Sequence, residues 1–248
     1  MDLELTGKAA IVTGGSRGIG KAIARELASE GADVAIVARN NDPLVATAED
    51  LIRDTGRRVV AIPADTGDDD AVKKMVEHAA AALSRIDILV NCAAQPGGNQ
   101  PVPNLSETTD DHFWPDMNVK VMGYLRCARE VSPYMRRQSW GRIINISGLA
   151  ARRSGSTIGS MRNASVVAMT KNLADELGPF GINVTVVHPG MTRTERTAGM
   201  LAEQARNEGI SVEEAEERSA RGNSVRRIID ASEIAYVVAF LASPKSIA

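Results

Sequence analysis

The chain has 248 residues, of which 44% are hydrophobic and 24% are charged, and its formal net charge is −2 at pH 7. This slightly acidic balance argues against a nucleic-acid-binding protein, which would carry a surplus of basic residues. No uninterrupted apolar run approaches the ~18–20 residues of a membrane-spanning helix. The acidic start, Met1-Asp2-Leu3-Glu4, lacks the apolar core of a signal peptide, so we expect a cytoplasmic protein without a membrane partner.

The two cysteines, Cys92 and Cys127, do not form a pair with metal-ligand spacing. Both lie in apolar stretches, so we expect buried free thiols in a reducing compartment. Acidic and histidine residues show no metal-ligand spacing either, and we therefore predict no metal site.

Apolar, strand-like runs alternate with helix-like segments along the whole chain. The predicted strands are 8–13, 33–38, 58–63, 87–91, 142–147 and 182–187. The helix near 68–84 has a capping-box spacing between Thr66 and Asp69, and a later helix has the same spacing between Asp230 and Glu233. Strands that are apolar throughout belong to parallel sheets covered on both faces. We therefore predict one doubly wound, Rossmann-like α/β domain over residues 1–248.

The first strand leads into a glycine-rich turn, Thr13-Gly14-Gly15-Ser16-Arg17-Gly18-Ile19-Gly20, and a helical pattern follows it. Such a turn directs backbone N–H groups and the positive end of the helix dipole toward one point, which suits a phosphate. Gly14 allows the tight turn, Gly18 lets a pyrophosphate approach the backbone, and Gly20 lets the helix pack close to the strand. The turn therefore predicts nucleotide binding.

The end of the second strand indicates which dinucleotide binds. A carboxylate there would bond the ribose 2′-hydroxyl of NAD, whereas an arginine would accept the 2′-phosphate of NADP. Arg39 directly follows this strand, where no Asp or Glu lies, and Arg17 in the glycine turn adds a second cation. Two guanidinium groups on one phosphate favour NADP(H) over the alternative of two solvated surface arginines.

Residues 191–224 interrupt the alternation, since they are polar and charged and show no strand signal. Ligands of open α/β sheets bind beyond the carboxyl ends of the strands, and this insertion follows the sixth strand. We expect a substrate lid that includes a helix starting near Ser211. The alternative is a solvated surface excursion.

These motifs together resemble the short-chain dehydrogenase/reductase family over nearly the whole chain. The resemblance rests on the glycine turn, on Asn91-Cys92-Ala93-Ala94 after the fourth strand, on Met117-Asn118-Val119-Lys120, on Ile144-Asn145-Ile146-Ser147 and on Pro189-Gly190. With the turn, it implies cofactor contacts by Gly14, Ser16, Arg17, Gly18, Ile19, Gly20, Arg39, Asp65, Thr66, Asn91, Ala93, Pro189, Gly190, Thr192 and Thr194.

The resemblance also implies catalytic roles for Ser147, which holds the substrate oxygen, and for Asn118 in a proton relay. The family uses a Tyr-x-x-x-Lys pair on the helix after the serine strand. Counting back from Met169-Thr170-Lys171 places Gly159 at the tyrosine position and Asn163 at the lysine position. The pair is therefore expected to be absent.

Other groups near this site are candidates for part of the missing chemistry. Arg162 could stabilise an oxyanion or hold an anionic substrate, and Asn163 could bond a ribose hydroxyl. Arg152 and Arg153 could join Arg162 in an anion-receptive mouth. The alternative is that these are ordinary helix and loop residues around a relic site.

The sequence thus predicts an NADP(H)-dependent oxidoreductase that transfers hydride between the cofactor and a small carbonyl or alcohol substrate, in an atypical or impaired active site. The alternative is a non-catalytic NADP(H)-binding sensor or partner subunit. The resemblance further implies a homodimer or homotetramer paired through helices near 107–138 and 157–178. Family members usually continue into a seventh strand, whereas this sequence ends at Ala248. Either this sequence is a truncated form or the protein has lost that strand, and in the second case we expect the sixth strand to have an uncovered edge.

Overall fold

A six-stranded parallel sheet in the order β3-β2-β1-β4-β5-β6 forms the centre of the computed structural model, which describes residues 2–95 and 102–247. The strands are β1 (Ala9–Thr13), β2 (Asp33–Ala38), β3 (Val59–Pro63), β4 (Ile88–Asn91), β5 (Gly141–Ile146) and β6 (Ile182–Val187). The strand order reverses between β1 and β4, where ligands of doubly wound sheets bind. The single-domain α/β fold class predicted from the sequence is confirmed.

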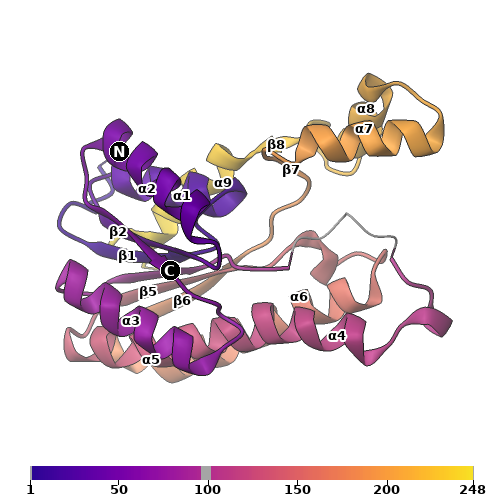
Figure 1. Ribbon diagram of the computed structural model, residues 1–248. Helices are drawn as coiled ribbons and strands as arrows, with labels where there is room; N and C mark the ends of the chain where they lie inside the picture. The colour runs from indigo at the N-terminus through magenta and orange to yellow at the C-terminus, as the bar shows by residue number, and fades with distance from the viewer. Residues whose placement is uncertain (1, 96–101, 248) are drawn as a thin grey trace.

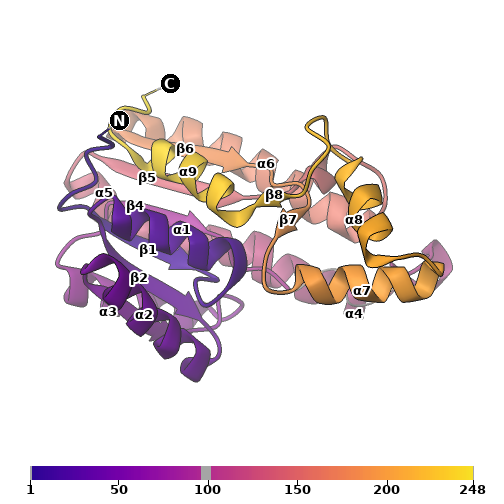
Figure 2. The same cartoon turned by 90° about the horizontal axis from the view of Figure 1, so that it is seen from above.

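Helices cover both faces of the sheet, as Figures 1 and 2 show. One face carries α1 (Gly18–Ser29), α2 (Asn41–Thr55) and α9 (Ala231–Ala242). The other carries α3 (Asp69–Leu83), α5 (Gly123–Arg137) and α6 (Thr157–Leu177), with α4 (Asp110–Asp116) beside α6. The strand side chains alternate between the faces, so Ala10 and Val12 enter the first core and Ile11 enters the second.

Local sequence signals account for several helix starts. Asp230 and Glu233 form the predicted capping box of α9, and the Ser211 side chain accepts from Glu214 N at the start of α8 (Val212–Ala220). The predicted cap of α3 is wrong. Asp68 caps this helix, because its carboxylate accepts the Ala71 N–H at 2.7 Å.

Helices α4 and α5 are joined by a π-helical segment, Met117–Met122. Such wide turns insert an extra residue and often occur at functional sites. The carbonyl of Asn118 accepts both the Gly123 N–H and Arg126 Nη1, and Arg126 also bonds the Thr66 carbonyl at 3.3 Å. These bonds tie the π segment to the loop after β3.

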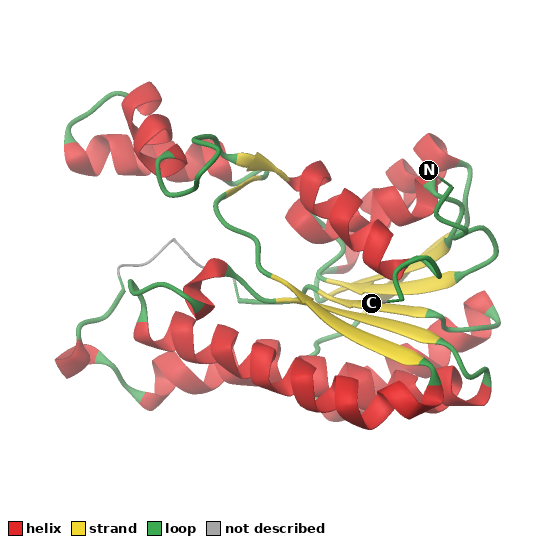
Figure 3. Ribbon diagram, turned by 180° about the vertical axis from the view of Figure 1, so that it is seen from behind, coloured by secondary structure: helices red, strands yellow, loops and turns green. Residues whose placement is uncertain are grey.

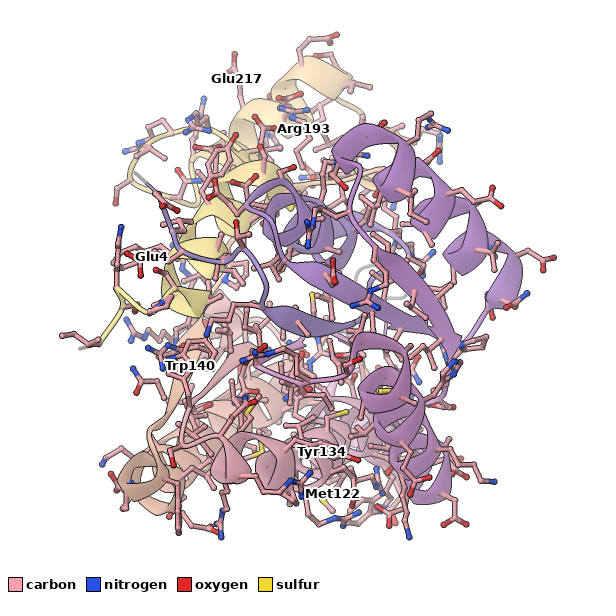
Figure 4. The ribbon with its side chains drawn as sticks, turned by 90° about the vertical axis from the view of Figure 1, so that its left-hand side faces the viewer. Glu4, Met122, Tyr134, Trp140, Arg193 and Glu217 are labelled. Carbon is pink, nitrogen blue, oxygen red and sulfur yellow. The ribbon has the colours of Figure 1, made fainter. Side chains whose placement is uncertain are left out.

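The 191–224 insertion lies beyond the carboxyl ends of the strands (Figures 1 and 3). It contains α7 (Thr197–Glu208), α8 and the short strand β7 (Thr192–Arg193), which the sequence did not predict and which pairs with β8 (Ile229–Asp230). Figure 4 labels Arg193, whose guanidinium pairs with Glu216 of α8. Leu201, Ala205 and Ala215 of the insertion form a small apolar core together with Ile228, which follows the insertion.

Candidate active site

The glycine turn between β1 and α1 has the predicted shape. Gly14 has φ +70°, a conformation that favours glycine. A Cβ on Gly20 would lie 2.2 Å from the Gly14 carbonyl oxygen, so the helix can only pack this closely because residue 20 has no side chain. The start of α1 therefore presents its N–H groups at the carboxyl end of the sheet.

A cavity of about 430 Å³ opens in front of this turn. Its lining includes eleven of the predicted cofactor residues: Gly14, Ser16, Arg17, Gly18, Ile19, Gly20, Arg39, Asp65, Thr66, Ala93 and Thr194. Its size, its glycine cradle and the start of α1 fit a dinucleotide with its diphosphate at the turn.

Four predicted cofactor residues do not line this cavity: Asn91, Pro189, Gly190 and Thr192. Asn91 is fully buried, and its Nδ2 donates to Asn145 Oδ1 at 2.9 Å and to the Tyr124 carbonyl. Asn145 in turn donates to Thr170 Oγ1 at 2.9 Å. The Asn91 side chain therefore connects β4 to β5 and α5 inside the protein, and Asn145 extends the connection to α6, so Asn91 does not line the cavity.

Arg17 and Arg39 both line the cavity and are exposed. Among the described residues, neither guanidinium lies within ion-pairing distance of a carboxylate, whereas most other arginines of the chain do. Two exposed cations on the same cavity wall suit a phosphate ester at the end of β2.

Glu195 is a lining residue that the sequence did not single out. Its Oε2 accepts the Gly18 N–H at 3.0 Å, so a carboxylate lies at the first turn of α1, where a diphosphate would bind. Gly18 also lies close to Thr194, because a Cβ placed on Gly18 would be 3.5 Å from Thr194 Cγ2. The beginning of the 191–224 insertion thus contacts the glycine turn.

Ser147 follows β5 and is 5% exposed. Its Oγ donates to the main-chain carbonyl of Asn163 at 3.0 Å and lies 3.4 Å from Asn163 Oδ1. Asn163 is buried on α6, and its Nδ2 donates to the Gly159 carbonyl at 2.7 Å. The structure therefore brings Ser147 and Asn163 together, with Gly159 one turn earlier on the same helix.

Asn118, the other expected catalytic residue, lies elsewhere. Its Nδ2 donates to the Gly67 carbonyl at 3.0 Å, on the side of the loop after β3. Lys120 reaches Ser147 instead, and its Nζ donates to the Ser147 carbonyl at 2.8 Å. The π segment changes which residues face the site, and a regular helical period does not predict this.

The three arginines expected to form an anion-receptive mouth do not converge. Arg162 pairs with Asp116, and both side chains are largely buried. Arg153 donates to the Gly222 carbonyl in the loop after α8, and Arg152 is exposed. The Arg162 charge is therefore matched by a carboxylate, so this guanidinium is not free to hold an anionic substrate.

Two further residues border Ser147. The hydroxyl of Tyr124, on α5, donates to the Ile146 carbonyl at 3.0 Å, and burial raises its pKa well above the usual value. Tyr124 is thus close to the site in space although it is distant in sequence. Its hydroxyl proton is, however, already used in the hydrogen bond to the Ile146 carbonyl. His188 Nδ1 lies 3.4 Å from the carbonyl oxygen of Gly148, the residue after Ser147.

A family model described as short chain dehydrogenase matches residues 8–205. The chain belongs to the short-chain dehydrogenase/reductase family. The short-chain reductase protein NovJ of Streptomyces niveus is 38% identical over 239 residues, which cover 96% of this chain and 87% of NovJ. The NADPH-dependent reductase BacG of Bacillus subtilis is 30% identical, with coverage of 96% and 92%.

Solved structures of short-chain dehydrogenases/reductases share the whole fold. L-sorbose reductase from Gluconobacter frateurii, complexed with NADPH and L-sorbose, superposes with a TM-score of 0.93 at 29% identity, over 99% of this chain and 93% of its own. These relatives are named reductases, and the family is enzymatic, which agrees with an enzyme here.

Other classes of site find no support in residues 2–95 and 102–247. No group of three or more histidine, cysteine, aspartate or glutamate side chains there could hold a metal ion. None of the helices described there has both the length and the apolarity to cross a bilayer.

Proposed function

We propose that this short-chain dehydrogenase/reductase is an NADP(H)-dependent oxidoreductase that interconverts a small carbonyl compound and its alcohol in an atypical active site. The single observation that carries the proposal is the cavity wall that runs from the glycine turn, through Arg17 and Arg39, to Ala93. Ala93 follows β4, which pairs with β5, the strand that Ser147 follows. Both a relative named as NADPH-dependent and a structural neighbour complexed with NADPH support the choice of cofactor.

In this proposal the residues of the wall and those near the end of β5 have separate tasks. NADPH, when bound, supplies a hydride for the carbonyl carbon. The N–H groups at the start of α1 hold the diphosphate, and Arg17 and Arg39 hold the 2′-phosphate. Ser147 turns its hydroxyl from the Asn163 carbonyl toward the substrate oxygen, and Asn163 offers its amide to a ribose hydroxyl.

The 191–224 insertion acts as the lid in this proposal. Its contacts with the rest of the chain include Glu195 with Gly18 and Arg153 with Gly222, near the two ends of the insertion. Its helices α7 and α8 pack mainly on each other around their own small core. A segment held in this way can move as a unit over the cavity.

We also propose a homodimer or homotetramer that associates through α5 and α6 in a reducing, cytoplasmic environment. Apolar side chains are exposed on this side of the molecule, with Met122 at 43%, Leu125 at 37% and Met161 at 47% (Met122 is labelled in Figure 4). Such exposed apolar groups mark association surfaces. The free thiols of Cys92 and Cys127 fit a reducing compartment.

The alternative function is NADP(H) binding without chemistry, and Gly159 and Asn163 are the residues that favour it. The test is single-turnover oxidation of bound NADPH with L-sorbose, cyclohexanone and a 2-oxo acid, which differ in polarity and charge. Turnover above the rate of the same reactants free in solution supports the oxidoreductase. Tight NADPH binding without turnover on any of the three supports the sensor.

A further inference from the structure

Lys120 is a buried lysine directed at the end of β5. It is 6% exposed, lies in the π segment between α4 and α5, and its Nζ donates to the Ser147 carbonyl at 2.8 Å. Lysine is almost never this buried in folded proteins unless its charge is paired, because an ammonium loses much hydration energy on burial. The Lys120 charge interacts with Cys92, which lines the cavity, and a buried, perturbed cation in such a place is a mark of a functional site.

The charged and titratable groups around Lys120 come from several elements. Burial, and to a lesser extent the Arg162 charge on α6, lowers the pKa of Lys120 to about 8, although Cys92 and Asp116 act in the opposite direction. The Asp116 carboxylate is engaged by Arg162, and burial raises the pKa of the Cys92 thiol to about 11. Lys120 is therefore an acid that is charged at neutral pH but releases its proton readily.

The other groups near Ser147 cannot take this role. Helix α6, all of which is described, contains no tyrosine, and its one lysine, Lys171, pairs with Asp175 on the surface. Asn163 has no proton to release near neutral pH. Among the described residues that hydrogen-bond to Ser147, only Lys120 carries an acid with a suitable pKa.

We propose that Lys120 is the proton donor of this site and gives its Nζ proton to a carbonyl oxygen held at Ser147. This inference rests on the proposed function. As the carbonyl carbon takes up the hydride that NADPH supplies, an N–H bond of Lys120 breaks and the O–H bond of the alcohol forms. The carbonyl is reduced, Lys120 is left as a neutral amine, and water returns its proton before the next turnover.

The bond to the Ser147 carbonyl holds Nζ in place before substrate arrives. Because this bond uses one of the three ammonium protons, two remain for a substrate oxygen. Lys120, in the π segment, thus supplies the proton, and Ser147, at the end of the sheet, binds the substrate oxygen. General acid catalysis of this kind contributes typically 10²–10⁴-fold to a rate.

The first test compares wild type with Lys120→Met, Lys120→Arg and the surface control Lys171→Met. We expect NADPH affinity within about threefold of wild type in all of them, and single-turnover reduction of the carbonyl panel slowed about 10²–10⁴-fold in both Lys120 variants only. Arginine keeps the charge but does not release its proton. The wild-type rate should fall as pH rises above about 8, since Lys120 then loses the proton it donates.

The second test needs no activity. In free protein with isotope-labelled lysine, the NMR resonance that disappears in Lys120→Arg should titrate near pH 8. Its midpoint should rise in Arg162→Met, which removes the neighbouring cation. A midpoint near 10.4, the ordinary value for lysine, would overturn the assignment even if the Lys120→Met variant does not fold.

The outcomes separate the inference from the proposed function. If wild type reduces a panel member and Lys120→Met does so equally fast, Lys120 is not the donor and the oxidoreductase proposal stands. If wild type binds NADPH but reduces none of the panel, the oxidoreductase proposal fails, and the donor role of Lys120 fails with it.

Discussion

The carboxylate of Glu195 accepts the main-chain N–H of Gly18 at 3.0 Å, at the first turn of α1. An acidic side chain from the insertion thus lies at the anion-binding end of the helix. A bound diphosphate would need the same N–H groups. Nucleotide binding and the position of residues 191–224 are therefore expected to be coupled.

The variant Glu195→Gln tests this coupling. Removing the charge takes away both a competitor for the helix N-terminus and a repulsion of the diphosphate, so NADPH affinity should rise about two- to fivefold. Calorimetric titration measures the change, with Glu203→Gln on α7 as the control. Weaker binding in Glu195→Gln than in wild type would mean that this carboxylate supports the bound cofactor.

The variant Arg39→Ala tests cofactor selection. Charge-assisted hydrogen bonds contribute about 1.5–3 kcal/mol each, and solvent exposure reduces that value, so we expect NADPH affinity to fall about tenfold. NADH affinity should stay within twofold, since this nucleotide lacks the 2′-phosphate. Equal affinities of wild type for the two nucleotides would contradict the assignment of Arg17 and Arg39.

Hydrogen exchange tests the lid. Amides of α7 and α8 should exchange quickly in the free protein, because the insertion has only a small core, and more slowly with NADPH bound. Amides of β1 and β4 serve as the internal reference, since these strands lie in the middle of the sheet. Full protection of α7 and α8 without nucleotide would identify the insertion as a fixed part of the domain.

A grafted tyrosine–lysine pair tests how far the site departs from its family. Asn163→Lys would bring a second ammonium to Ser147 beside Lys120, and a Cβ on Gly159 would lie 2.9 Å from Ser156 Oγ, which caps α6. We therefore expect Gly159→Tyr with Asn163→Lys to leave carbonyl reduction no faster and to lower the Tm. Adding Lys120→Asn should raise the rate above that of the double variant.

Steady-state rates and thermal melts of the double and triple variants, with Lys120→Asn alone as the reference, provide the measurement. A double variant that reduces carbonyls faster than wild type would show that Lys120 does not interfere with a tyrosine–lysine pair at these positions.

Much of the fold could be predicted from the sequence, because runs such as Val34–Val37 place apolar side chains on both faces of the strand. This pattern is typical of a parallel strand that is covered on both faces. All six strands of the main sheet agree with their predicted ranges to within one residue. The cap of α3 was missed because Thr66, Asp68 and Asp69 all suit a helix start, and only the hydrogen bond to Ala71 distinguishes them.

The site was less predictable, because contacts between distant segments decide it. The motif pointed to Asn118, but the π segment, stabilised by Arg126, turns Lys120 toward Ser147. Asn91 fits a cofactor motif, yet its bond to Asn145 on the neighbouring strand keeps it inside. No local pattern signals Glu195, which meets Gly18 across 177 positions of sequence.

The central claim is hydride transfer from NADPH to a carbonyl carbon in this site. The most direct measurement is a single turnover with NADPH stereospecifically deuterated at the transferred position, offered with L-sorbose, cyclohexanone and a 2-oxo acid. We predict an alcohol product that carries one deuterium on the former carbonyl carbon, formed faster than without protein. Deuterated NADPH that binds tightly and is recovered unchanged with every compound would contradict the claim.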